Sequence, residues 1–181
     1  MTAAAERPEP KPAYTGVLVG IAAITMSFAA FTSALVVRQG ASPDWQHFQL
    51  PTILYVNTLL LVASSVTLET SRRRLAHGFT GLYVTLALGL LFVLGQVLAW
   101  RNLAAQGLFL ATNPSSAFFY IFTALHAAHL LGGVAGLSYA LHRLQGATAP
   151  AASAALGAAT LYWHFMAVLW IYLLAVLFLR I

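Results

Sequence analysis

Three histidines lie inside long apolar stretches of this 181-residue chain. His126 and His129 are three positions apart in "FFYIFTALHAAHLLGGVAG", so on a helix they share one face. His164 lies ten residues into the apolar stretch 154–179, which places it at a similar depth. Imidazole is a common ligand of zinc, copper and iron, so three histidines at one level raise the possibility of a bound metal or haem.

The geometry of a single helix weighs against such a metal or haem site. Two histidines on one face of one helix cannot ligate opposite faces of the same iron, so His164 has to supply the second ligand. No carboxylate is expected at that depth, because Glu69 lies about 10–15 Å away along the membrane normal by helix rise. Interhelical hydrogen bonds are the commoner use of imidazole inside a membrane. We therefore expect His126, His129 and His164 to be structural, with His164 joining its helix to that of His126 and His129.

The remaining polar side chains at membrane depth are few. Glu69 is the only acidic residue in any apolar stretch, and it comes just before Arg72 and Arg73. It can extend toward the interface with an arginine partner, or it can form a lipid-headgroup or proton-related site. Asn57 and Gln96 are expected to form hydrogen bonds within or between helices. No Ser-His-Asp set, Gly-rich phosphate loop or paired carboxylates occurs, and the absence of cysteine excludes disulfides and thiolate metal sites.

The elements that carry these side chains are predicted to be transmembrane helices. Hydrophobic residues make up 60% of the chain and charged residues only 7%, whereas about a quarter of a soluble domain is charged. Each apolar stretch is long enough to cross the hydrocarbon core, and none alternates as a barrel strand does. The fold class is thus an all-α integral membrane protein with a single domain, 15–181. Its five helices are expected at about 15–37, 50–70, 79–100, 117–141 and 154–179, after a disordered tail, 1–14.

Small and aromatic residues indicate where helices meet. Gly132 and Gly136 form a small-xxx-small pattern, which allows another helix to approach closely. Gly133 continues the face of the two histidines, so this face is expected to be a helix–helix contact. Trp163 and Trp170 lie seven residues apart on one face, deep in the last helix, where packing is the expected role.

The distribution of cations predicts the orientation. The tail and the loops 71–78 and 142–153 share one side of the membrane and carry six arginines and lysines, and the other side carries three. The positive-inside rule then places the N-terminus in the cytoplasm and the C-terminus outside. The expected localisation is therefore the cytoplasmic membrane.

Four stretches together resemble subunit III of the haem-copper cytochrome c oxidases. "YWHFMAVLW" (162–170) is similar to the most specific motif of that family, and "FFYIFTALHAAHLLGG" (118–133) to its segment with two histidines followed by glycines. "LPTILYVNTLLLVASSVTLE" (50–69) and "GLLFVLGQ" (89–96) resemble two further helices. The matches follow the family's order over about residues 50–180.

The resemblance implies a five-helix form that lacks the two N-terminal helices of longer members. It implies a non-catalytic chain without haem or copper of its own, which packs on subunit I beside subunit II, holds phospholipid, and supports sustained turnover and proton uptake. Two positions depart from the pattern, because Ala23 and Ala167 stand where longer members have acids. Alternatives are an accessory subunit of a nitric oxide reductase or a quinol oxidase, and a small membrane enzyme with a histidine-bound metal.

Overall fold

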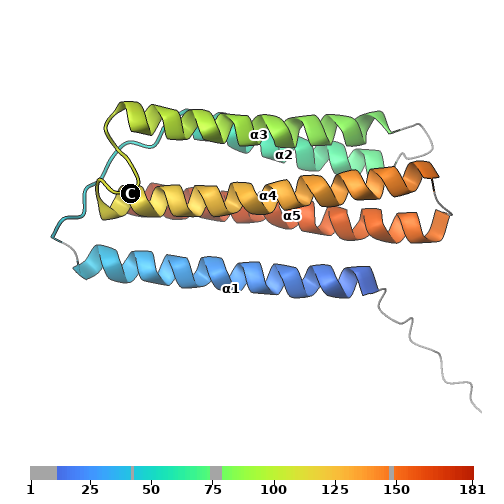
Figure 1. Ribbon diagram of the computed structural model, residues 1–181, viewed down its shortest axis with the longest axis horizontal. Helices are drawn as coiled ribbons and strands as arrows, with labels where there is room; N and C mark the ends of the chain where they lie inside the picture. Colours follow the sequence, from blue (N-terminus) through green and yellow to red (C-terminus); the bar gives the residue numbers. More distant parts are fainter. Residues whose placement is uncertain (1–11, 42, 74–78, 147–148) are drawn as a thin grey trace, which may run out of the picture.

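A computed structural model describes residues 12–41, 43–73, 79–146 and 149–181 of the chain. Figure 1 shows its helices lying side by side along the long axis. They are α1 (Pro12–Ala41), α2 (Ile53–Arg73), α3 (Thr80–Ala105), α4 (Pro114–Gly146) and α5 (Ala149–Arg180). All five are long and apolar enough to cross a membrane, and no strand occurs in the described ranges. The predicted all-α fold with five transmembrane helices is confirmed.

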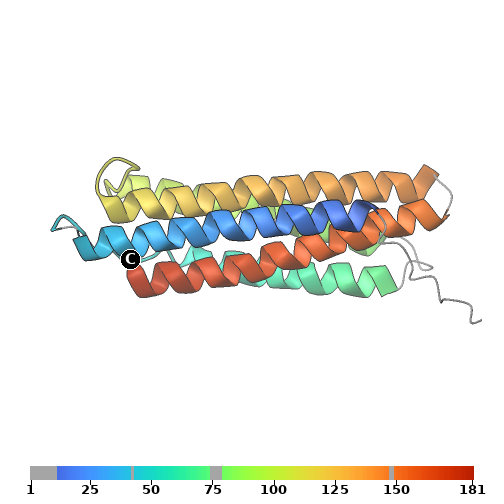
Figure 2. The ribbon, with the colours of Figure 1, turned by 90° about the horizontal axis from the view of Figure 1, so that it is seen from below.

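The five helices alternate in direction and form two pairs plus one outer helix. α2 packs chiefly on α3, and α4 packs chiefly on α5, with α5 also touching α2. α1 lies against α5 and α4 on the side away from α2 and α3 (Figures 1 and 2). We name the two ends of the bundle after a residue at each, the Trp45 end and the Arg72 end.

Four of the five helices are longer than the apolar stretches that predicted them, whereas α2 has the predicted length but begins and ends three residues later. α1 begins at Pro12, so the last three residues of the predicted tail 1–14 are helical, while residues 1–11 lie outside the described ranges. Hydropathy detects only the part of a helix that lies in hydrocarbon, and the turns beyond it are more polar. At the start of α4, the backbone N–H of Ser116 donates to Asn113 Oδ1 at 2.7 Å. Asn113 is therefore the N-cap, and Pro114 occupies the first helical position, where its missing N–H costs nothing.

The connection between α1 and α2 packs against the end of α5. The backbone N–H of Phe48 donates to the carbonyl of Ile181 at 3.2 Å, and Trp45 Nε1 donates to the carbonyl of Arg180 at 3.2 Å. These donors satisfy carbonyls that the last turn of a helix leaves without an intrahelical partner.

The helices are apolar on nearly every face, so polarity does not distinguish the core from the outer surface. The two differ in the size and shape of their side chains. Large aliphatic side chains such as Met26, Leu59 and Leu179 are at least 70% exposed and face away from the rest of the bundle. The inside is filled by large aromatic rings, which are almost completely buried: Phe28, Phe92, Phe119, Phe122, Trp163 and Trp170. Lipid chains are as apolar as leucine, so packing and hydrogen bonding select the buried face.

Candidate functional site

Two buried tryptophans of α5 bind hydroxyl groups of α2. Trp163 Nε1 donates to Ser64 Oγ at 3.0 Å, and Trp170 Nε1 donates to Thr58 Oγ1 at 2.9 Å. The tryptophans lie two helical turns apart, and because α2 runs antiparallel to α5 their partners follow in reverse order. Both indoles are fully buried, so each N–H needs a partner. We call these four residues the indole seam.

His164 lies beside the indole seam, at the Arg72 end. Its Nδ1 is 3.2 Å from Ser65 Oγ, and its Nε2 is 3.9 Å from Glu69 Oε2. The prediction that His164 joins its helix to that of His126 and His129 is therefore wrong. His164 therefore contacts the same helix as its neighbour Trp163, which donates to Ser64 of α2.

Glu69 interacts with the two arginines that follow it. Arg72 donates through Nε to Oε2 and through Nη2 to Oε1, both at 2.9 Å, and Arg73 Nε donates to Oε1 at 2.6 Å. The arginine partners expected from the first interpretation of Glu69 are present. The expected distance of about 10–15 Å between Glu69 and the histidines does not hold for His164. The estimate came from sequence position along each helix and assumed that all three histidines lie at one depth.

The other two histidines contact different neighbours. His126 is fully buried, with its ring centroid 5.0 Å from that of Trp170 and 5.6 Å from that of Phe92. His129 Nδ1 lies 2.7 Å from the carbonyl of Leu125 in its own helix, and a carbonyl can only accept, so Nδ1 carries the proton.

The three histidines do not converge. His126 contacts Trp170, which lies six residues, or about 9 Å, along α5 from His164. His129 instead has its ring centroid 6.0 Å from that of Phe28 on α1. Among the described residues, no group of three or more His, Cys, Asp or Glu side chains could hold a metal ion. The arrangement therefore gives no support to the histidine-metal enzyme.

The predicted glycine contact on α4 is present at one position and absent at two. A Cβ added to Gly133 would lie 3.2 Å from Tyr162 Cε1 and 3.6 Å from Trp163 Cε3, so α5 does approach α4 there. Nearby, Tyr162 Oη donates to the carbonyl of His129 at 3.0 Å. A Cβ on Gly136 would meet nothing within 4 Å, and one on Gly132 only Tyr162 Oη at 3.9 Å. The small-xxx-small pattern therefore does not mark a close helix crossing.

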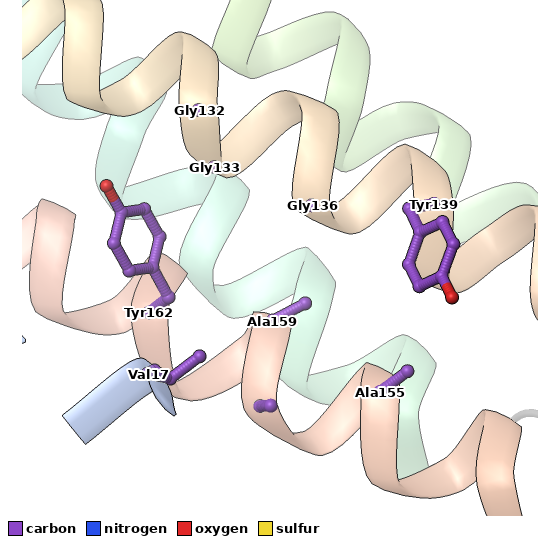
Figure 3. Close-up of a pocket in the computed structure, with 9 residues that line it drawn as sticks. Val17, Gly132, Gly133, Gly136, Tyr139, Ala155, Ala159 and Tyr162 are labelled. Carbon is purple, nitrogen blue, oxygen red and sulfur yellow. The ribbon is translucent and has the colours of Figure 1, made fainter. Parts of the chain in front are cut away.

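Gly132 and Gly136 instead line a groove. It has a volume of about 360 Å³ and lies between α4, α5 and the first turns of α1 (Figure 3). Figure 3 shows Tyr162 at one end, Tyr139 at the other, and small side chains of α5 along the floor. We call it the α1 groove; its lining residues are Val17, Gly132, Gly133, Gly136, Tyr139, Ala155, Ala158, Ala159 and Tyr162.

The closest helix approaches involve glycines that sequence reasoning did not single out. A Cβ on Gly89 of α3 would lie 2.6 Å from Trp163 Cη2, and one on Gly95 would collide with the amide of Asn57. Between α3 and α4, Trp100 Nε1 donates to Thr123 Oγ1 at 2.9 Å. The glycines in the sequence of α3 indicated that another helix could approach closely there. They do not indicate which large side chain fills the space beside each glycine.

Comparison with known proteins agrees with this architecture. The family model described as cytochrome c oxidase subunit III matches residues 18–180. The chain belongs to the cytochrome c oxidase subunit III family. It is 31% identical over 179 residues to a Mycobacterium tuberculosis protein named probable cytochrome c oxidase subunit 3, covering 93% of this chain and 88% of that one.

More distant members of the subunit III family give the same result. Cytochrome c oxidase subunit 3 of a Synechocystis species is 26% identical over 175 residues, covering 91% of this chain and 74% of the relative. Membership implies a membrane oxidase complex with a respiratory role, and with five transmembrane helices the chain is a multi-pass protein of the bacterial inner membrane. The positions that depart from the family pattern differ in exposure, because Ala167 is buried one turn from His164 whereas Ala23 is exposed on α1.

Proposed function

We propose that the chain is the non-catalytic subunit III of a bacterial haem-copper terminal oxidase, cytochrome c oxidase. The match of residues 18–180 to the family carries this proposal. Haem and copper belong to subunits I and II, and this chain packs on subunit I and supports sustained turnover and proton uptake. The three separated histidines agree with a chain whose polar residues join helices and hold no redox centre.

A gentle-detergent pull-down of the tagged full chain tests this proposal. We expect haem absorption in the eluate, together with a catalytic subunit identified by peptide sequencing. Co-purification of the catalytic subunit of a nitric oxide reductase or a quinol oxidase would move the chain to that complex. A colourless protein eluting alone would overturn the proposal. The same preparation, with subunit III selectively removed, should lose activity sooner during repeated turnover.

The proposed orientation has the N-terminus in the cytoplasm and the C-terminus in the periplasm. It rests on the cation count, to which Arg72 and Arg73 at the end of α2 contribute. A protease-sensitive tag at either terminus tests it in spheroplasts. We expect the C-terminal tag to be cleaved from outside and the N-terminal tag to be protected, and the reverse pattern would invert the topology.

We further propose that a phospholipid acyl chain occupies the α1 groove. The groove is apolar, and small residues keep it open between α1 and the α4–α5 pair. At the Arg72 end, the guanidinium carbon of Arg143 lies 5.7 Å from the centre of the Tyr139 ring, one turn along α4, where it can meet a headgroup phosphate. Native mass spectrometry should find fewer bound phospholipids in Gly136→Leu than in the parent, and an unchanged number would contradict this assignment.

A further inference from the structure

Three amide and imidazole side chains are buried in the centre of the bundle without partners. Asn57 on α2, Gln96 on α3 and His126 on α4 are each 0% exposed. None of their side-chain nitrogen and oxygen atoms has a hydrogen-bond partner among the described residues. An unpaired buried polar group costs about 1–3 kcal/mol, so this concentration in one bundle requires an explanation.

Contacts between α2 and α3 place Asn57 and Gln96 at the same level. The hydroxyls of Thr67 and Thr85 are 3.0 Å apart, and Asn57 lies directly against Gly95. The two contacts are ten residues apart on each helix, so they fit the same antiparallel alignment of α2 and α3. Gln96, which follows Gly95, is therefore level with Asn57.

His126 lies at this level too. Its ring contacts Phe92, one turn before Gln96, and Trp170, whose indole binds Thr58 beside Asn57. On the other side of Gln96 along α3, Trp100 donates to Thr123 of α4. Because α3 and α4 are antiparallel, going four residues back from Trp100 and three residues forward from Thr123 brings Gln96 to about the level of His126. Asn57, Gln96 and His126 thus form a polar layer contributed by three helices, and Trp170 of the fourth packs beside it.

We propose that this polar layer is a binding site for buried water, which links Asn57, Gln96 and His126 in one hydrogen-bond network. Each amide offers two N–H donors and a carbonyl acceptor, and neutral imidazole offers one donor and one acceptor. Water both donates and accepts, and a buried water makes about three hydrogen bonds, so it suits a mixed set of this size. A cation would leave the N–H donors unpaired, and an apolar ligand would leave every group unpaired.

The hydrated layer explains how three polar side chains persist at membrane depth. Water-mediated bonds are nearly as favourable in enthalpy as direct ones, so they remove most of the cost of burying these groups. They also connect α2, α3 and α4 at a single level. A shift of any one of these helices along its axis would break the network.

Solid-state NMR of the full chain in lipid bilayers tests the proposal. With ¹⁵N-labelled histidine, asparagine and glutamine, we expect magnetisation transfer from water protons to the His126 ring and to the Asn57 and Gln96 amides. His126→Phe assigns the ring signal by its disappearance. Transfer directly between the side chains with none from water would overturn the proposal.

A pair of variants tests the link between the three residues. Gln96→Met should shift the His126 ring signals and reduce their transfer from water at least two-fold, because the two residues share bound water. The matched control is Thr160→Val, since Thr160 is buried but donates to the carbonyl of Leu156 in its own helix at 2.8 Å. Unchanged His126 signals in Gln96→Met, or an equal change in Thr160→Val, would overturn the shared network.

Discussion

The two sides of α5 are packed in different ways. Toward α2, Trp163 and Trp170 are fully buried and each indole binds a hydroxyl. Toward α1, the contact is close where Tyr14 meets Gly157, and at the other end Tyr172 Oη donates to Thr32 Oγ1 at 2.8 Å. The α1 groove begins beside the first of these contacts.

The difference shows what holds helices together in a membrane. Lipid competes equally for any apolar surface, so association depends on close packing and on interhelical hydrogen bonds. The contact between α5 and α2 contains two buried indole–hydroxyl bonds, whereas the contact between α5 and α1 contains an exposed hydroxyl pair and borders open space. We therefore expect α2–α5 to form the stable unit and α1 to be held less strongly.

The largest expected effect comes from filling the space opposite Trp163. In Gly89→Leu the new Cβ would lie 2.6 Å from Trp163 Cη2, and Ser64 holds that indole in place. Overfilling a packed core typically costs about 1–3 kcal/mol, so the variant should melt at a clearly lower temperature in detergent. Gly133→Leu should show a smaller loss, since its nearest neighbour, Tyr162, is 3.2 Å away and at the edge of the groove.

Gly136→Leu is the matched control, with the same substitution in the α1 groove. Nothing lies within 4 Å of its Cβ position, so the melting temperature should stay near that of the parent. Equal losses in Gly89→Leu and Gly136→Leu would remove the distinction between the two sides of α5.

A smaller effect is expected from the hydrogen bonds alone. A double-mutant cycle of Trp163→Phe and Ser64→Ala should give a coupling free energy of about 0.6–1.7 kcal/mol, the range for interhelical hydrogen bonds in membranes. The corresponding cycle of Tyr172→Phe and Thr32→Val should give a value closer to zero, because Tyr172 is 41% exposed and packing fixes its ring less firmly than the buried Trp163. Reversible unfolding of the detergent-solubilised chain measures both. A larger coupling for Tyr172 and Thr32 would reverse the comparison.

The smallest effect is expected at Glu69. Glu69→Gln removes the charge that pairs with Arg72 and Arg73, but the arginine side chains are 44% and 72% exposed, so solvent and salt screen these pairs. We expect a melting temperature close to that of the parent, with the difference vanishing in high salt. A loss as large as that of Gly89→Leu would mean that Glu69 and His164 contribute much more to the α2–α5 contact than their exposure suggests.

Part of the site followed from the sequence. The pairing of Glu69 with the arginines was predictable because residues three and four apart on a helix meet. The seven-residue spacing of Trp163 and Trp170 likewise predicted one shared face. The partners of His164 and His126 were not predictable, since helices with apolar residues on nearly every face carry no polarity signal for their rotation in the bundle.

The sequence by itself determined that this protein spans the membrane with five helices, because hydropathy and length decide whether a segment enters hydrocarbon. The motif order likewise led to the subunit III family, which the comparison confirmed. Only the tertiary structure decided that His164 faces α2, that Gly136 borders a groove, and that Asn57, Gln96 and His126 share one level. The reason is that helix rotation and register depend on how large side chains fit opposite small ones, a property of pairs of helices.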